Sequence, residues 1–182
     1  YPFGYGLSYT EFEQKMGELE EKDGQISVDV VVTNTGDVAG KDVVEVYYNP
    51  PYTNGGIEKA SANLIEFAKT DLLQPGESQT VTVTFSIEDM ASYDENNAKA
   101  YVLEKGDYVI SINSDSHTVL DQKTYTADAD VVYEGENKRA SEDTAATNVF
   151  EDAKGDVTYL SRADHFANYK EATAEPASAE LG

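Results

Sequence analysis

A strict alternation of side chains marks the segment ISVDVVVT, residues 26–33. Its aliphatic residues Ile26, Val28, Val30 and Val32 fall on one side of an extended chain, and mostly polar residues fall on the other. A period of two is typical of a β-strand that buries one face. The following NTGD, residues 34–37, favours a reversal or a crossing between sheets, because Asn and Gly tolerate positive φ and Asp bonds to neighbouring backbone.

Working outward, the same signal recurs along the chain. Residues 43–48, 63–69 and 80–87 are rich in β-branched and aromatic side chains and predict three more strands. Two prolines and two glycines between residues 50 and 56 predict a loop, since proline removes backbone donors. In QPGE, residues 74–77, proline precedes glycine as a type II turn prefers.

The later part of the β-rich region contains shorter signals. Ser86 is placed to cap one helical turn that runs through Met90. Residues 100–103 and 107–112 flank Lys105-Gly106 and predict a hairpin, and residues 119–132 predict one last strand. Six or seven short strands without a long helical period predict an all-β chain, folded as a β-sandwich.

Composition and charge exclude several classes of function. The chain has 13 basic and 35 acidic residues, a formal charge of -22, and no cysteine. This charge repels phosphate backbones and anionic membranes, so we expect neither a nucleic-acid nor a membrane partner. Without cysteine there is no disulfide framework and no thiolate metal site. The compartment is open between cytoplasm and secretion from a bacterium, with the cytoplasm slightly favoured.

The last quarter of the chain has a different character. Small polar residues dominate after Tyr133, so we expect residues 134–182 to be a linker or tail. Apolar islands within it predict short docking segments around residues 149–169. The domain boundaries that follow are an interdomain segment at residues 1–10, a sandwich over residues 11–133, and the tail.

No group of residues predicts catalysis, cofactor binding or metal binding. Hydrolysis of a glycoside with retention needs two carboxyl groups about 5 Å apart, and no pair stands out among the many acids. Neighbours such as Asp94 and Glu95, or Asp128 and Asp130, are interpreted as solvated surface. The two histidines, His117 in a predicted turn and His165 in the tail, are assigned exposed or packing roles. Among the 13 tyrosines, Tyr52 is the candidate for contact with a sugar, because an aromatic face suits a pyranose.

The opening YPFGYGLSYT, residues 1–10, resembles the segment by which family 3 glycoside hydrolases enter their fibronectin type III-like domain. Further segments resemble that domain in the same order along the chain: residues 32–40, 67–69, 73–78, 90–94 and 104–108. One departure is Tyr101, which stands where many relatives have tryptophan. The resemblance implies an immunoglobulin- or fibronectin-III-like sandwich from a parent of the β-glucosidase or β-xylosidase type. Residues 150–152 and 155–162 are similar to linkers in members with reversed domain order.

The resemblance also implies a function. In that family the catalytic aspartate and the acid/base carboxylate lie in other domains, so this chain by itself is expected not to be an enzyme, whereas its parent is. We therefore expect a non-catalytic accessory module that packs against the catalytic domains of the same parent polypeptide and stabilises them. The residues expected to dock are apolar or aromatic and lie at both ends of the chain: Tyr1, Pro2, Phe3, Tyr5, Leu7, Tyr9, Phe150, Tyr159 and Leu160.

Two alternatives belong to other classes. A carbohydrate-binding module would anchor the parent on polysaccharide through exposed tyrosines such as Tyr52, and binding to insoluble glucan or xylan would distinguish it. A cell-surface immunoglobulin-like adhesion domain would be favoured by tandem repeats, and the sequence contains no internal repeat.

Overall fold

The computed structural model describes residues 10–141 together with positions 162, 163, 165 and 167. Within these residues the fold is almost entirely β-structure, with one short 3-10 helix, η1 (Ile87–Met90). The strands are β1 (Phe12–Lys22), β2 (Gln25–Asn34), β3 (Val43–Asn49), β4 (Asn63–Lys69), β5 (Ser78–Ser86), β6 (Ser92–Asp94), β7 (Ala100–Leu103), β8 (Gly106–Asp115), β9 (Thr118–Ala127) and β10 (Val131–Tyr133).

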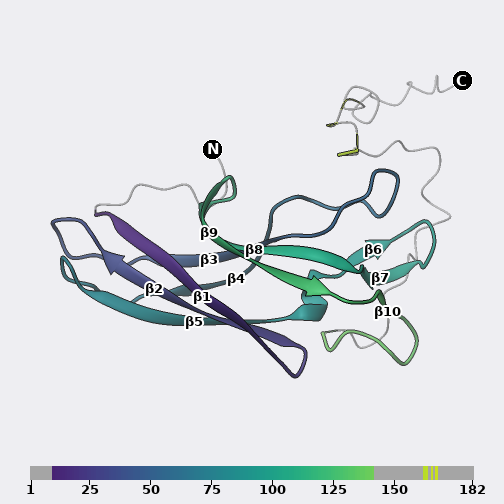
Figure 1. The fold of residues 1–182 in the computed structure, drawn as a ribbon, viewed down its shortest axis with the longest axis horizontal. Coiled ribbons are helices and arrows are strands. Elements are labelled where there is room, and N and C mark those ends of the chain that lie inside the picture. Colours follow the sequence, from purple (N-terminus) through teal and green to yellow (C-terminus); the bar gives the residue numbers. More distant parts are fainter. Residues whose placement is uncertain (1–9, 142–161, 164, 166, 168–182) are drawn as a thin grey trace, which may run out of the picture.

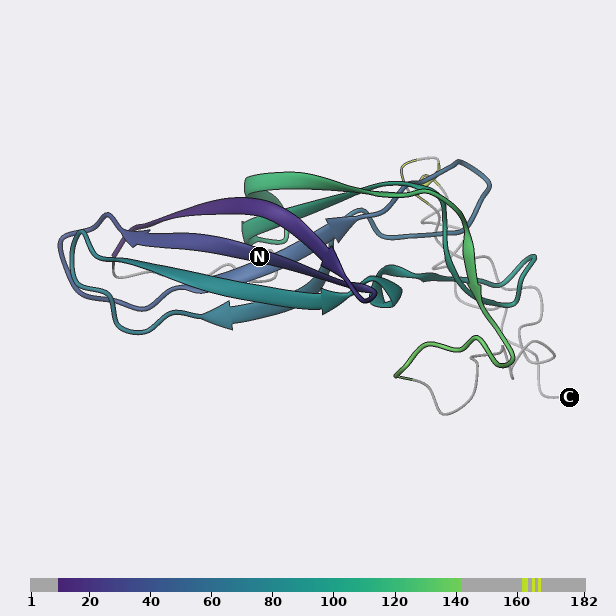
Figure 2. The same ribbon diagram turned by 60° about the horizontal axis from the view of Figure 1, so that its bottom comes forward.

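Two antiparallel sheets form the layers of a sandwich. One has the strand order β1-β2-β5 and the other β4-β3-β8-β9, and a small sheet β10-β7-β6 lies at one end (Figure 1). The turned view separates the layers, and it places β9 beside β1 where the two sheets meet (Figure 2). Hydrogen bonding from the Met16 amide to Asp121 Oδ2, 3.0 Å, joins these two edges.

The core lies between the two larger sheets. The aliphatic side chains of β2 at positions 26, 28, 30 and 32 are at most 1% exposed, as their alternation predicted. Val83 and Phe85 from β5 pack with them, and Ile110 and Ile112 from β8 come from the facing sheet. The predicted all-β sandwich is confirmed, because burial of one face of each sheet is what stabilises two packed layers.

Two predicted reversals have the expected geometry. In the turn before β5, Gly76 has φ +81° and the Glu77 amide donates to the Gln74 carbonyl over 2.9 Å, which defines a type II turn. After β2, the chain crosses from one sheet to the other, and β3 therefore pairs with β4 and β8 instead of β2. Residues 34–37 were compatible with either a hairpin or a crossing between sheets, and the structure has the crossing.

The predicted hairpin of residues 100–103 with 107–112 is wrong. Strand β7 pairs with β6 and β10, whereas β8 pairs with β3 and β9. Gly106 has φ +137°, a conformation that L side chains rarely adopt, and there the chain passes from the small sheet into the large one. The strand predicted at residues 119–132 is divided, since β9 ends at Ala127 and β10 begins at Val131.

Two strands were missed by the pattern of the sequence. β1 alternates poorly because charged residues occupy much of it, and it has a bulge between Met16 and Leu19. It is an edge strand, where charged side chains discourage pairing with other molecules. β6 has only three residues, too few for a period to be seen. The helical turn after Ser86 is confirmed as η1, but the Ser86 side chain makes no capping hydrogen bond.

Asp94 is not the solvated surface residue that sequence analysis expected. It is 7% exposed, and its carboxylate accepts hydrogen bonds from the amides of Asn96, Asn97 and Ala98, each 3.1 Å long. Burial by itself would raise the pKa of Asp94, but these three N–H donors hold that pKa below its ordinary value. The carboxylate thus organises the turn between β6 and β7.

Asp94→Asn is expected to lower the free energy of unfolding by about 1–3 kcal/mol at neutral pH, because buried amides lose a charged acceptor. Since the folded-state pKa is depressed, this stabilisation is present above the unfolded pKa of about 3.9 and is lost as the pH falls through the folded value. Urea unfolding of both proteins between pH 7 and pH 2 measures it, and the difference should vanish at the acid end. The exposed Asp128→Asn is the control; a difference of constant size down to pH 2 would contradict the prediction.

Candidate interaction site at the loop end of the sandwich

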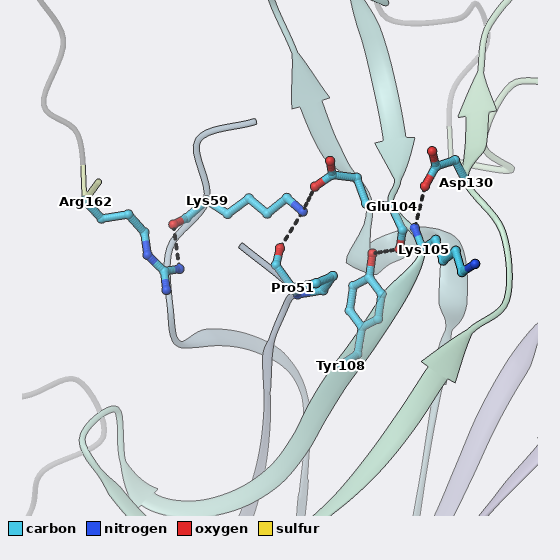
Figure 3. Close-up of polar contacts among 7 residues, drawn as sticks. All are labelled: Pro51, Lys59, Glu104, Lys105, Tyr108, Asp130 and Arg162. Atoms are coloured by element: carbon cyan, nitrogen blue, oxygen red, sulfur yellow. Dashed lines mark hydrogen bonds and ion pairs between the residues drawn. The ribbon is translucent and has the colours of Figure 1, made fainter. Parts of the chain in front are cut away.

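A buried lysine holds the long loop between β3 and β4, residues 50–62, against the rest of the sandwich. The Lys59 side chain is 2% exposed, and its ammonium group forms an ion pair with Glu104 and donates to the Pro51 carbonyl over 2.7 Å (Figure 3). Glu104 follows β7. A cation buried in this way needs a carboxylate partner, so the ion pair fixes the loop on the small sheet.

Further hydrogen bonds hold the segment around Glu104 that pairs with Lys59. Tyr108 Oη donates to the Glu104 carbonyl over 2.9 Å, and the Lys105 amide donates to Asp130 Oδ1 over 2.6 Å (Figure 3). Burial, followed by the nearby negative charge of Glu104, raises the pKa of Tyr108, so its hydroxyl stays protonated and able to donate. A Cβ at Gly106 would stand 3.0 Å from Pro51, so glycine lets the loop approach this closely.

The outer side of the loop receives an arginine from the tail. The Arg162 guanidinium carbon lies 4.1 Å from the centroid of the Tyr52 ring, and Nη1 donates to the Lys59 carbonyl over 2.9 Å. The Arg162 amide donates to Glu58 Oε1, also over 2.9 Å. Tyr52, the residue predicted to contact sugar, therefore has one ring face occupied by a guanidinium. Its contact with sugar stays a prediction.

A second surface is formed by the outer face of the sheet β4-β3-β8-β9. Phe67 and Leu64 of β4 stand opposite Glu45 and Tyr47 of β3 and are 55% and 39% exposed. On the far edge, Val119 is 51% exposed. Tyr47 itself is buried, and burial, then the charge of Glu45, raises its pKa to about 12. This face carries large apolar groups outside the core.

The outer face of the other sheet is different. Hydroxyl and carboxylate groups pair across its strands, and one apolar residue, Val31, is exposed among them. The cross-strand pairs are Ser27 with Thr84, Thr33 with Ser78, and Asp29 with Thr82, at 2.8, 2.7 and 2.6 Å. Such groups are well solvated, so the two outer faces of the sandwich differ in chemistry.

Of the other predicted positions, His117 lies in the exposed turn between β8 and β9, and His165 is exposed in a turn after Arg162, as expected. The nine predicted docking residues between Tyr1 and Leu160 lie outside the described residues. Lys59, Glu104 and Arg162 were missed. Their spacing in sequence carries no signal, although the confinement of both arginines of the chain to an acidic tail could have drawn attention to Arg162.

Among the described residues, no group of three or more His, Cys, Asp or Glu side chains could hold a metal ion. In the same part of the chain, no helix is long and apolar enough to cross a membrane.

Comparison with known proteins identifies the class. Residues 42–116 match the fibronectin type III-like domain family, and the sandwich described above has that architecture. The structure also superimposes on part of a β-glucosidase from Kluyveromyces marxianus solved with glucose, with a TM-score of 0.67 and 32% identity over 73% of this chain and 16% of that one. A β-glucosidase from Paenibacillus barengoltzii matches with a TM-score of 0.65 and 39% identity, over 72% and 16% of the two chains.

Relatives in sequence agree. A β-glucosidase of Ruminococcus albus is 36% identical over 174 residues, which cover 92% of this chain and 18% of the relative. Residues 1–141 make up a smaller share of this chain than the matched 92%, so the similarity extends into the tail. β-Glucosidase A of Butyrivibrio fibrisolvens is 43% identical over 59% of this chain and 15% of its own length. The chain thus spans less than a fifth of these relatives. It contains a fibronectin type III-like domain and is similar to one part of family 3 β-glucosidases.

Proposed function

We propose that this module is a non-catalytic structural part of a β-glycosidase and packs against the catalytic domains that hydrolyse β-glycosidic bonds. The observation that carries the proposal is the contrast between the two outer faces of the sandwich. One face is a ladder of hydroxyl and carboxylate groups, whereas Phe67, Leu64 and Val119 expose apolar surface on the other.

Large exposed apolar groups on one face mark contact surfaces, because burying them against another domain removes apolar area from water. The proposed contact face is therefore the outer side of β4-β3-β8-β9, with Phe67 on its edge strand β4. Relatives that are β-glucosidases match this chain over a small part of their length, which supports a partner within the same polypeptide. The predicted docking residues at the chain's two ends are further candidates for that contact.

Phe67→Asp tests the proposal in the full-length parent. A carboxylate forced into an interdomain contact costs more than about 2 kcal/mol, so the variant is expected to lower the thermal midpoint and soluble yield of the parent. In the isolated 182-residue chain, where the side chain is exposed, the midpoint should hardly change. Val31→Asp is the matched control, since Val31 is similarly exposed on the polar face.

Equal effects of Phe67→Asp and Val31→Asp in the parent would contradict the assigned face. Aryl-glycoside assays on the same preparations test the other half of the proposal. We expect hydrolysis of p-nitrophenyl β-glucoside by the parent and none by the isolated chain, and turnover by the chain alone would overturn the non-catalytic role.

A further inference from the structure

Arginine is distributed unevenly in this chain. The sequence has 13 basic residues, of which only Arg139 and Arg162 are arginines, and both follow the last strand of the sandwich. Both guanidinium groups lie over tyrosine rings that belong to the sandwich. A planar, weakly hydrated guanidinium stacks on an aromatic face better than an ammonium group does.

The first contact is at the small sheet. The Arg139 guanidinium carbon lies 3.6 Å from the centroid of the Tyr101 ring. The Tyr93 ring contacts the Tyr101 ring in a T-shaped arrangement, with ring centroids 5.5 Å apart and planes at 75°. Beside this contact, the Ala140 amide donates to Glu88 Oε1 of η1 over 2.9 Å. The ring that receives Arg139 is thus fixed by its own strand and by a second aromatic residue.

The second contact is at the loop of residues 50–62. Arg162 meets three groups there: the Tyr52 ring, the Glu58 carboxylate and the Lys59 carbonyl. The loop is held independently of the tail, because the buried Lys59 ammonium pairs with Glu104 (Figure 3). The guanidinium thus contacts an aromatic face and a carbonyl on a fixed loop, and the Glu58 carboxylate accepts from the Arg162 backbone amide.

We propose that Arg139 and Arg162 form a two-point clasp that binds the tail to the sandwich through Tyr101 and Tyr52. Both receiving sites lie at the same end of the sandwich, where β6, β7, β10 and the loop of residues 50–62 gather (Figure 1). The clasp fixes the path of the chain after β10 at two positions 23 residues apart in sequence. Arg139 and Arg162 are then bound to the sandwich, whichever surface the sandwich uses toward other domains.

Limited digestion with trypsin tests each point directly, since trypsin must take the arginine side chain into its own pocket. Initial cleavage rates after Arg139 and Arg162 are measured by mass spectrometry in the full 182-residue chain. Synthetic peptides of residues 134–146 and 156–168 give the unprotected rates. Cleavage in the chain is expected to be slower than in the peptides, and Tyr52→Leu should speed cleavage after Arg162 by about 3- to 10-fold, the change that loss of a cation–π contact predicts. Tyr101→Leu should do the same for Arg139.

Tyr52→Phe and Tyr101→Phe keep the rings and are the matched controls, with rates expected to stay at the wild-type level. NMR gives a second readout that needs no variant: the Arg162 side-chain protons should resonate upfield of their positions in the peptide, because they lie over the Tyr52 ring. Chain and peptide rates that agree at either arginine, or Arg162 protons at peptide positions, would overturn the two-point clasp.

Discussion

Replacing Asn34 with aspartate is expected to lower the free energy of unfolding by about 4 kcal/mol at pH 7. Asn34 is fully buried, and its Nδ2 donates to the Val38 and Leu73 carbonyls over 2.8 and 2.9 Å. Its Oδ1 accepts from Thr10 Oγ1 and from the Gly36 amide, both over 3.0 Å. Aspartate has nearly the same shape but would point an oxygen at two carbonyl oxygens. Keeping that carboxyl protonated from its usual pKa of about 3.9 up to pH 7 costs about 1.4 kcal/mol for each pH unit.

The pH dependence separates this cause from simple loss of packing. The folded-state pKa of the introduced carboxyl would be raised, so the variant approaches wild-type stability below the unfolded pKa and loses it as the pH rises. Urea unfolding at pH 4, 5.5 and 7 measures the difference between the two proteins. Asn54→Asp, in the exposed loop, adds the same charge without burial and is the control. A deficit that does not change with pH would rule out the proposed cause.

Removing the carboxylate beside Lys59 is expected to have the next largest effect. Glu104→Ala leaves a buried ammonium group with the Pro51 carbonyl as its remaining acceptor among those described above. Removing one partner of a buried ion pair costs about 3 to 5 kcal/mol of unfolding free energy. We expect the lower value, about 3 kcal/mol, because the Glu104 side chain is about a third exposed. Chemical unfolding at pH 7 measures the loss.

A double-mutant cycle provides the control for this pair. Lys59→Met by itself removes the buried charge, and Lys59→Met with Glu104→Ala removes both charges of the pair. We expect the double variant to be more stable than Glu104→Ala, because an apolar replacement avoids burial of an unpaired charge. If the losses in unfolding free energy of the two single variants simply add in the double variant, then the contribution of Lys59 to stability does not depend on Glu104.

The clearest strand signals in the sequence come from strands with one buried and one exposed face. In β2 and β5 the buried face is aliphatic or aromatic and the opposite face is mainly polar and more exposed, so a period of two is visible. β1 was missed because an edge strand can carry charges on positions that a central strand cannot. The hairpin at Lys105-Gly106 was wrong because a glycine between two β-rich runs indicates a reversal or a change of sheet equally well.

The candidate sites could be predicted to a smaller extent. Tyr52 was selected as an aromatic residue in a loop, but its guanidinium partner is 110 positions away in the sequence. Lys59 and Glu104 are ordinary charged residues in an acidic chain, and nothing local distinguishes a buried lysine from an exposed one. Asp94 was assigned to the surface for the same reason, although three backbone amides surround its carboxylate.

By itself the sequence determined the all-β class, the crossing or reversal at each strong turn, and the resemblance to the fibronectin type III-like domain of family 3 glycoside hydrolases. These depend on side-chain period, on backbone preferences of glycine and proline, and on motifs, all of which are local. Only the tertiary structure decided which strands pair, which outer face is apolar, and which charges are buried with a partner. Those features depend on contacts between residues far apart in the chain, and their free energies arise only when the two sheets close over a common core.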